Sequence, residues 1–466
     1  MLCLTGTERT IEALTRRLSS YSDVPLHEVR LDFLPDPSTA FGLPRRFPIL
    51  FTCRSSAQGG GFSGPEAERR LILHAALDVG PRFLDVDFCE DMSLHRDLFE
   101  KRGPTRLIAS HHVFDLSWRS SGLPKGFGET PADVFKVAVA VEDAADLTDL
   151  LTATKGLGKP TIRIAMGGPG RLSRILSTVM DSPINFVSPD DGPGTAKGQL
   201  TLSEARLLRA DVTGLTPLGL LGGESVAASP GPRVYNRLFE AHGLPFVYTT
   251  LETRRPIETI ELAEMLGFRA LAVTMPHKAA VLPVLTEVRP PADLIGAVNT
   301  ILLRNGARIG LNTDSIAIRQ LLAPHRSRRA LVLGAGGAAR AAVVALRDLG
   351  CPVELCARNA DAASAFASRL GARHIRWEQR FDAEFDLVVN ATPSPDPIPE
   401  FTRWPGRVLL DASLSVAPTP IVQTARNSGA TVMTGLSWWR AQGQAQLSAI
   451  LEEYSVPTLP PLENDP

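Results

Sequence analysis

The sequence predicts an α/β protein in which an N-terminal (β/α)8 barrel precedes a two-domain unit, made of a smaller α/β domain and a doubly wound parallel sheet. Three observations lead to this expectation. The chain has 466 residues, its first 210 residues contain eight short apolar runs separated by helix-like stretches, and a strand–glycine–helix pattern surrounds residue 334. A chain of this length is too long for one ordinary domain.

The eight apolar runs of the first part are expected to be β-strands. They are Met1–Thr5, His27–Leu34, Pro48–Cys53, Arg82–Phe88, Arg106–His112, Phe135–Val141, Thr161–Met166 and Ile184–Ser188. The segments between them, such as Pro65–Val79 and Ala144–Thr154, have apolar residues at helical spacing. Eight strands alternating with helices favour a (β/α)8 barrel, and an open doubly wound sheet is the alternative.

Polar residues interrupt these runs near their carboxyl ends, where a barrel carries its chemistry. They are Glu28, Arg30, Asp32, Arg54, Asp85, Asp87, His111, His112 and Lys136, with Gly167, Gly168 and Arg174 after the seventh run. Glu28, Arg30 and Asp32 occupy alternate positions, so we expect them to share one face. The pattern predicts a site at one barrel mouth. Salt bridges inside the barrel, for example Arg30 with Asp85, are the structural alternative.

Lys136 is the most informative of these residues because Phe135, Val137 and Val139 surround it. Burial disfavours an ammonium, and a neutral amine can attack a ketone to form a Schiff base. A histidine titrates near neutral pH and suits proton transfer. Lysine and histidine in one barrel mouth therefore indicate imine-assisted removal of a proton next to a carbonyl.

Residues 1–210 resemble type I 3-dehydroquinate dehydratases. The stretches that carry the resemblance are HEVRLDFL, FTCRSS, FLDVDF, IASHHVF, FKVAVAV, IRIAMGGPGRLSRI and GTAKGQLTLSE, in that order. The resemblance implies that Lys136 forms the imine and that His112 is the base, with His111 as the second choice. It also implies a substrate site formed by Glu28, Arg30, Arg54, Asp87, Arg174, Thr195 and Gln199. The family has glutamate at Asp87, in a position implied to orient His112.

A new apolar run, Leu215–Gly223, marks the boundary to the second part. Farther on, Arg329–Leu333 reads as a strand that leads into Gly334, Ala335, Gly336, Gly337 and Ala338 and then into an alanine-rich stretch. A strand, a glycine turn and a helix can hold a pyrophosphate against backbone amides and the helix N-terminus, although a plain tight turn has the same pattern. The further strands expected here are Val353–Ala357, Phe385–Val389 and Val408–Asp411.

The residue after the second of these strands is Arg358. An acidic residue at this place favours NAD, because it binds the ribose 2′-hydroxyl, whereas an arginine favours the 2′-phosphate of NADP. A solvated surface arginine is the alternative. The pattern predicts NADP (NADPH) as the cofactor of the second part, and no cofactor is expected for the barrel.

Three motifs precede the glycine turn: VTMPHK at 273–278, GAVNT at 296–300 and GLNTD at 310–314. Their amides, hydroxyls and Lys/Asp pair suit a substrate with several hydroxyl groups, although turns and helix caps also use such residues. In this order, followed by GAGGAARA, they resemble shikimate dehydrogenases over residues 215 to about 452. The resemblance implies an α/β substrate domain and a Rossmann NADP domain.

The same resemblance assigns roles to residues of the second part. Lys278 and Asp314 are implied as the catalytic pair. Ser229, Thr274, Asn299, Asn312 and Gln442 are implied to bind substrate. The cofactor is implied to contact Gly334, Ala335, Gly336, Gly337, Ala338, Arg358, Asn390, Ala391, Thr392 and Gly435. Three positions depart from the family pattern: Gly231 replaces a serine, Leu414 replaces a tyrosine and Ala357 replaces an asparagine.

Together these patterns predict three domains: residues 1–212, residues 213–322 completed by a helix at 436–455, and residues 323–435. The expected function is a bifunctional shikimate-pathway enzyme that converts 3-dehydroquinate to 3-dehydroshikimate and then to shikimate. A chain with one active half and a non-catalytic metabolite sensor are the alternatives.

Composition narrows the possible partners. Lys and Arg (49) nearly balance Asp and Glu (50), which argues against nucleic-acid or membrane partners and leaves small-molecule substrates. Five cysteines without a C-x-x-C spacing predict reduced core thiols. No signal peptide, membrane span or metal site is expected. We therefore expect a cytoplasmic monomer or homodimer.

Overall fold

The computed structural model describes residues 1–88, 95–192, 194–325, 329–381, 385–398, 407–415 and 417–453. The chain divides into two compact units, Met1–Phe268 and Arg269–Pro466. The division falls inside the segment 213–322. The first unit therefore contains the eight-stranded sheet together with the two strands that follow it.

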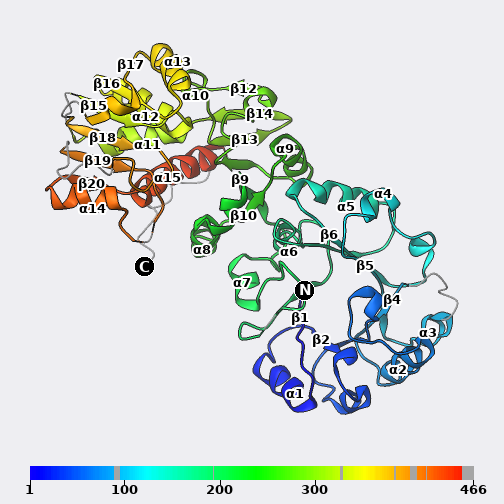
Figure 1. The fold of residues 1–466 in the computed structure, drawn as a ribbon. Coiled ribbons are helices and arrows are strands. Elements are labelled where there is room, and N and C mark those ends of the chain that lie inside the picture. Colours follow the sequence, from blue (N-terminus) through cyan, green and yellow to red (C-terminus); the bar gives the residue numbers. More distant parts are fainter. Residues whose placement is uncertain are drawn as a thin grey trace. The chain divides into compact units, whose positions relative to one another are not determined.

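Eight parallel strands form the expected barrel of the first unit (Figure 1). They are β1 (Leu2–Leu4), β2 (His27–Arg30), β3 (Ile49–Thr52), β4 (Phe83–Asp87), β5 (Arg106–Val113), β6 (Val134–Ala140), β7 (Thr161–Met166) and β8 (Asn185–Val187). Their order is β7-β6-β5-β4-β3-β2-β1-β8, so strands that follow one another along the chain are neighbours, as in a (β/α)8 fold. Each of the eight predicted runs overlaps one of these strands.

The α-helices of the barrel lie outside its strands (Figure 1). They are α1 (Ile11–Ser20), α2 (Glu66–Asp78), α3 (Arg96–Lys101), α4 (Trp118–Ser121), α5 (Leu147–Thr154), α6 (Arg171–Ile175) and α7 (Leu202–Leu207). Local sequence sets where several of them start. Thr201 and Glu204 form a capping box at α7, because each side chain binds the backbone N–H of the other residue.

Residues that alternate along the central strands change from apolar to polar toward the carboxyl ends. Leu50, Phe83, Ile108 and Val134 belong to one buried apolar cluster. Two residues later on the same strands are Thr52, Asp85, Ser110 and Lys136, all buried. Because side chains two residues apart share a face of a strand, the barrel interior has an apolar floor with a polar layer above it.

The second strand ends well before its predicted run does. β2 ends at Arg30, and Leu31–Phe33 form a 3-10 turn. The prediction that Asp32 continues the alternation of Glu28 and Arg30 is therefore wrong. The turn instead places the carboxylate of Asp32 against the guanidinium of Arg30, with contacts of 2.9 and 2.5 Å.

The first unit continues with β9 (Thr216–Gly222), α8 (Gly231–Ala241), β10 (Phe246–Glu252) and α9 (Pro256–Met265), and β9 and β10 pair in parallel. The second unit begins with β11 (Ala270–Val273), β12 (Glu287–Val288), α10 (Ala292–Ile295), β13 (Thr300–Arg304), β14 (Ala307–Leu311) and α11 (Thr313–Leu322). In the second unit, β13 runs antiparallel to both β11 and β14.

A six-stranded parallel sheet follows in the second unit. Its strands are β15 (Ala330–Leu333), β16 (Val353–Cys356), β17 (Arg373–His374), β18 (Leu387–Asn390), β19 (Val408–Asp411) and β20 (Thr431–Met433). Their order, β17-β16-β15-β18-β19-β20, is the 3-2-1-4-5-6 order of a Rossmann fold. Its helices are α12 (Gly337–Asp348), α13 (Ala360–Leu370) and α14 (Pro420–Asn427).

Both faces of this sheet are buried. Alternate residues of β15, Ala330 and Val332 on one side and Leu331 and Leu333 on the other, belong to two separate apolar clusters. The chain then forms α15 (Gly435–Glu453), and residues 454–455 of the predicted helix lie outside the described residues.

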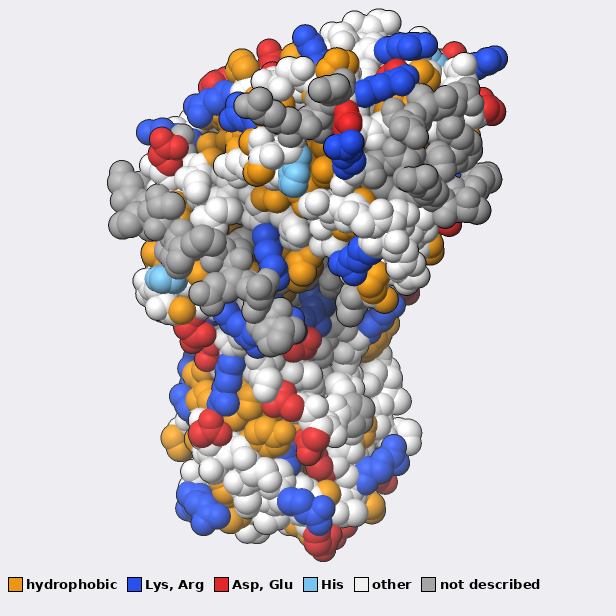
Figure 2. Space-filling view, turned by 90° about the vertical axis from the view of Figure 1, so that its left-hand side faces the viewer, with side chains coloured by type: hydrophobic (Ala, Val, Ile, Leu, Met, Phe, Trp, Pro, Cys, Tyr) orange, Lys and Arg blue, Asp and Glu red, His pale blue; other side chains and the backbone are white. Residues whose placement is uncertain are grey.

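Cys3, Cys53, Cys351 and Cys356 are buried free thiols, as predicted, whereas Cys89 lies outside the described residues. Within the described residues, no helix is both long enough and apolar enough to cross a membrane. On the face drawn in Figure 2, basic and acidic side chains are interspersed.

Candidate active sites

The mouth of the barrel contains a cavity where most of the predicted dehydratase residues meet. Its lining includes eight of them: Glu28, Arg30, Arg54, His112, Lys136, Arg174, Thr195 and Gln199. They come from six different strands or the loops that follow those strands. The remaining one, Asp87, lies beneath Arg54 and contacts its guanidinium at 3.0 Å.

Lys136 extends from the middle of β6 into this cavity and is only 5% exposed. Its Nζ lies 3.1 Å from Asp85 Oδ2 and 4.0 Å from the ring centroid of Phe186. Burial alone would raise the pKa of Asp85, but the charges of Arg54 and Lys136 and the Ser110 hydroxyl lower it well below its ordinary value. The amine therefore faces a carboxylate that stays ionised.

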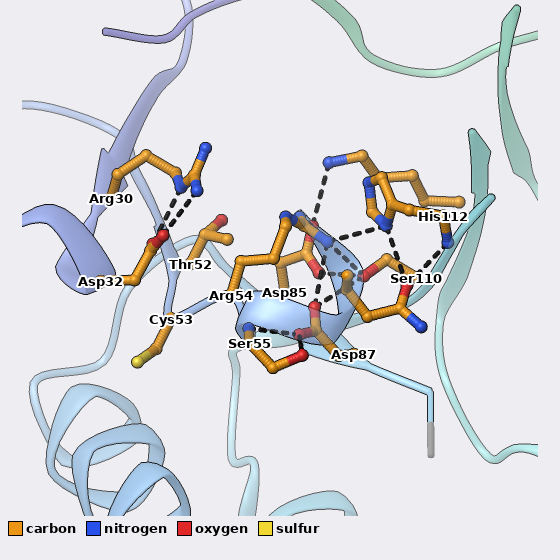
Figure 3. Close-up of polar contacts among 12 residues, drawn as sticks. Arg30, Asp32, Thr52, Cys53, Arg54, Ser55, Asp85, Asp87, Ser110 and His112 are labelled. Atoms are coloured by element: carbon orange, nitrogen blue, oxygen red, sulfur yellow. Dashed lines mark hydrogen bonds and ion pairs between the residues drawn. The ribbon is translucent and has the colours of Figure 1, made fainter. Parts of the chain in front are cut away.

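Arg54 is the centre of the polar network beneath the cavity (Figure 3). Its Nη2 donates to Asp85 Oδ2 at 2.9 Å, and its Nη1 donates to Asp87 Oδ1 at 3.0 Å and to Ser110 Oγ at 3.2 Å. The structural alternative predicted salt bridges inside the barrel. Such salt bridges are present, but their partners differ from the predicted pair of Arg30 with Asp85. Arg30 pairs with Asp32, and Asp85 pairs with Arg54 and Lys136.

His112 is the histidine of the motif that lines the cavity. Its Nδ1 lies 2.9 Å from Arg54 Nη1 and 3.3 Å from Gln58 Oε1. Burial first, and then the positive charges of Arg54 and Lys136, lower the pKa of His112 well below its ordinary value. The neutral form, which a base requires, therefore predominates at neutral pH.

His111 does not line the cavity. Its ring packs instead against Phe88 and Phe127, with centroid distances of 6.5 and 6.0 Å. The direction of the two neighbouring side chains thus separates the histidines, because successive residues of a strand point to opposite faces.

Asp87 does not meet His112 as the resemblance implied. Its described contacts are with Arg54, Arg69, Ser110 and the backbone and hydroxyl of Ser55. The side chains that touch the imidazole nitrogen are Arg54 and Gln58, so Asp87 acts on His112 only through Arg54.

Arg174 combines deep burial with an unused donor. Its Nη1 donates to the Phe186 carbonyl at 3.3 Å, and its Nε has no hydrogen-bond partner within the described residues. Burial, with a smaller contribution from Arg171, lowers the pKa of Arg174 to about 10, so it remains charged at neutral pH. A buried cation with an unsatisfied donor is suited to bind a carboxylate. Nearby in the lining, Gln199 Oε1 accepts from Thr195 N at 2.7 Å.

Sequence reasoning missed three residues of this site. Gln58 contacts His112, Ser110 joins Arg54 to Asp85, and Phe114 stacks over His112 with 6.4 Å between ring centroids. Phe114 is 57% exposed at the cavity mouth and passes so close to Gly59 that a Cβ there would lie 2.3 Å from the ring. The position of Phe114, two residues after His112, was a sequence signal that could have found it. Gln58 lies in a loop without sequence periodicity, so no pattern indicated its role.

The second unit contains the predicted lysine–aspartate pair. Lys278 lies in the turn that follows β11, and Asp314 lies in the first turn of α11. The Nζ of Lys278 donates to Asp314 Oδ2 at 2.5 Å. The aliphatic stem of Lys278 is also near the glycine turn, because a Cβ added to Gly337 would lie 3.4 Å from Lys278 Cδ. The pair therefore lies beside the start of α12.

The predicted amides are largely engaged within the protein. Asn299 donates to Thr313 Oγ1 at 3.0 Å and to Gln442 Oε1 at 3.4 Å, which joins the GAVNT motif to α15. Asn312 is the N-cap of α11, so the helix-cap alternative describes it well. Thr274, directly after β11, is half-buried. Ser229, in the first unit, accepts a hydrogen bond from Gly231 N at 3.2 Å.

The glycine turn follows β15 as predicted, and three features suit it to a dinucleotide. Gly334 has a φ of +113°, and a Cβ there would lie 2.9 Å from the Ala391 carbonyl. A Cβ added to Gly336 would meet nothing within 4 Å, which leaves its backbone open to a ligand. Gly337 begins α12, whose N-terminus favours an anion.

The other cofactor candidates differ in exposure. Arg358 is exposed after β16, Ala335 lies in the turn, Ala338 lies in the first turn of α12, and Gly435 begins α15. Asn390 is fully buried at the end of β18 and binds Asp411 at 2.8 Å and the Thr392 hydroxyl at 2.7 Å. Asn390 therefore shapes the loop that carries Ala391 and Thr392.

The chain combines a (β/α)8 barrel, which has a buried lysine and a histidine in its mouth, with a Rossmann sheet that has a lysine–aspartate pair beside it. This combination defines a two-part metabolic enzyme. Residues 2–210 match the family model of type I 3-dehydroquinase. Residues 221–301 match the model of the shikimate dehydrogenase substrate binding domain. The chain therefore belongs to the type I 3-dehydroquinases in its first part and to the shikimate dehydrogenases in its second, as a bifunctional enzyme of the shikimate pathway.

Solved structures of related proteins are similar to this chain. The dehydroquinate dehydratase and shikimate dehydrogenase from S. pombe is 26% identical, with 97% of this chain and 95% of that chain covered and a TM-score of 0.43. The shikimate 5-dehydrogenase from Thermus thermophilus, in complex with NADP(H) and shikimate, is 32% identical over 51% of this chain and 94% of that one, with a TM-score of 0.45. The shikimate dehydrogenase from Aquifex aeolicus is 27% identical over 53% and 94%, with a TM-score of 0.47.

Proposed function

We propose that the barrel dehydrates 3-dehydroquinate through an imine on Lys136 and that the second part reduces the resulting 3-dehydroshikimate to shikimate with NADPH. The observation that carries this proposal is the pair of amines. The chain has seven lysines: Lys136 is the buried one, Lys278 is the half-buried partner of Asp314, and the other five are exposed.

In the barrel, the Lys136 ammonium first gives a proton to a water molecule, and the resulting amine attacks the substrate ketone. The ketone oxygen then leaves as water and one proton is taken up from solvent, which gives the protonated imine. The imine withdraws electrons, which makes the adjacent C–H acidic. His112 removes that proton, and the hydroxyl on the next carbon leaves as water with a proton returned by His112. Hydrolysis of the imine then releases the product and restores Lys136. The unsatisfied guanidinium of Arg174 is suited to the substrate carboxylate.

In the second part, Lys278 is placed to donate a proton to the oxygen of the carbonyl group as it is reduced, and Asp314 holds the ammonium in position. Thr274, Asn299 and Asn312 belong to the three sequence motifs, and Gln442 contacts Asn299 at 3.4 Å; their hydroxyl and amide groups are available for the substrate. The open backbone at Gly336 and the N-terminus of α12 fit a dinucleotide pyrophosphate. The nicotinamide supplies the hydride chemistry when bound.

A coupled assay tests the proposal directly. Purified full-length protein given 3-dehydroquinate and NADPH should consume the nicotinamide absorbance, because the first activity feeds the second. With 3-dehydroshikimate in place of 3-dehydroquinate, oxidation should start without a lag. A protein that oxidises NADPH with neither compound would contradict the reductase activity, and a protein that oxidises it with 3-dehydroshikimate alone would contradict the dehydratase activity.

Replacement of Arg358 by glutamine should raise the KM for NADPH by about tenfold or more, because a charged hydrogen bond to the 2′-phosphate is lost. The KM for NADH, which has no such phosphate, should stay nearly unchanged. The measurement is steady-state reduction of 3-dehydroshikimate with each cofactor. Arg426→Gln, at an exposed position in α14, is the matched control. Equal losses with both cofactors would refute a phosphate role for Arg358.

A further inference from the structure

The short helix α10 ends against helices of the Rossmann sheet (Figure 1). A helix leaves its last carbonyl groups without partners inside the helix, and that end has a partial negative charge. Here those carbonyls accept hydrogen bonds from two arginines. Arg340 Nη1, on α12, donates to Gly296 O at 2.9 Å and to Ile295 O at 3.2 Å. Arg369 Nη2, on α13, donates to Asp293 O at 2.6 Å. The Rossmann helices therefore hold α10 by its C-terminal carbonyls.

Gly296 leaves room for both guanidinium groups. Its φ is +65°, in the left-handed region that favours glycine, and a Cβ there would lie 3.3 Å from Arg340 Nη1 and 3.5 Å from Arg369 Nη1. Burial lowers the pKa of Arg340, and the nearby charge of Arg369 lowers it further. Because like charges repel, the neighbouring carbonyls of α10 are what holds the two cations close to each other.

The backbone that follows α10 also fixes the turn that carries Lys278. Val298 N, two residues after Gly296, donates to the Lys278 carbonyl at 2.7 Å. The residue between them, Ala297, accepts from Asn312 Nδ2 through its carbonyl at 2.9 Å. A displacement of Gly296 would therefore pass along two peptide units to the backbone of Lys278.

The glycine turn meets the same backbone from the Rossmann side. Gly337 begins α12, and a Cβ added there would lie 3.1 Å from Ala297 Cβ and 3.4 Å from Lys278 Cδ. Arg340 lies in the first turn of the same helix. One turn of α12 thus both follows the proposed pyrophosphate site and binds the chain beside Lys278.

We propose that Arg340 is a positioning residue of the reductase site, because its hydrogen bonds to Gly296 and Ile295 hold the turn of Lys278 in place against the glycine turn. The inference rests on the proposed function of the second part. In the reduction the carbonyl carbon gains the hydride of NADPH, which becomes NADP, and the carbonyl oxygen gains a proton from Lys278. Both transfers need a fixed distance between the cofactor turn and Lys278, and a displacement of about 1 Å can lower a rate by about 100-fold.

Two substitutions separate the donors of Arg340 from its packing over Phe366, where the guanidinium carbon lies 4.0 Å from the ring centroid. Arg340→Met keeps an unbranched side chain and removes every donor, whereas Arg340→Lys keeps a charged donor. In steady-state reduction of 3-dehydroshikimate we expect Arg340→Met to lower kcat about tenfold and Arg340→Lys to keep at least about a third of it. The Kd for NADPH, from fluorescence titration, should change by less than about threefold in both variants.

Hydrogen exchange provides a readout that needs no cofactor. The amides of Gly296 and Val298 are hydrogen-bonded, and the two contacts of Arg340 hold the segment that contains them. We expect the peptide that covers residues 293–300 to exchange about tenfold faster in cofactor-free Arg340→Met than in the wild type, with Arg340→Lys between the two. Peptide mass analysis of the full-length protein measures these rates.

Arg347→Met makes the same change at an exposed position of α12 and should leave both kcat and exchange unchanged. If Arg340→Met is unfolded and does not bind NADPH, Arg369→Met takes its place. Loss of the contact with Asp293 should then raise exchange of the same peptide about threefold, and an unchanged rate would overturn the inference.

The remaining outcomes separate the inference from the proposed function. Wild-type kcat or wild-type exchange in a folded Arg340→Met protein would overturn the positioning role. A weaker Kd for NADPH at unchanged kcat would overturn it too, because Arg340 would then act on cofactor binding alone. A wild-type protein that does not reduce 3-dehydroshikimate would instead remove the proposed function of the second part.

Discussion

Replacing Lys136 with alanine is expected to lower kcat for dehydration of 3-dehydroquinate by at least about 10³-fold, because the nucleophile that forms the imine is lost. Reduction of 3-dehydroshikimate by the same protein should be unchanged. Both activities are measured on one preparation, the first from the conjugated product and the second from NADPH oxidation.

Lys136→Arg separates the amine chemistry of this residue from its charge. Arginine keeps a positive charge opposite Asp85 but does not form an imine, so it should be as inactive as alanine. Lys155→Ala, at an exposed position after α5, should retain full activity. Borohydride added with 3-dehydroquinate should reduce the imine and attach the carbon skeleton to Lys136, which peptide mass analysis locates among the seven lysines. Substantial turnover by Lys136→Arg would exclude the imine mechanism.

Replacing Lys278 with methionine is expected to lower kcat for NADPH-dependent reduction by about 10²- to 10⁴-fold, the usual contribution of a positioned proton donor. Methionine retains most of the aliphatic stem that lies near Gly337, so the KM for NADPH should change little. Steady-state rates with 3-dehydroshikimate provide the measurement.

The dehydratase activity of the Lys278→Met protein serves as its internal control and should equal that of the wild type. Asp314→Asn makes a near-isosteric change in the partner of Lys278 and should lower the same rate constant, since it removes the carboxylate that holds the ammonium. A parallel loss of dehydration in either variant would mean that the two reactions do not have separate sites.

Local patterns predicted the secondary structure of the barrel well. All eight strands were found, because short apolar runs between helix-like stretches are set by residues close in sequence. The exception is the end of β2, where alternating polarity continued to Asp32 but the backbone turns after Arg30. The contact between Arg30 and Asp32 that accompanies this turn is made by side chains only two residues apart.

The pairing of charges in the site could not be predicted from spacing. Arg54 meets Asp85 and Asp87 from a neighbouring strand, and Gln58 reaches His112 across 54 residues. Such contacts depend on strand order, on the stagger of neighbouring strands and on the course of a loop. A resemblance that places one acidic residue near the base does not show which side chain touches the ring.

The two folds, the order of their elements and the chemical types of the reacting groups were predictable from the amino-acid sequence, because periodicity and motif residues are properties of short segments. The tertiary structure alone decided which of two adjacent histidines enters the cavity, which carboxylates hold Arg54, and that an amide faces the imidazole of His112. Those choices depend on distances between residues far apart in the chain, and those distances exist only after the strands have assembled side by side.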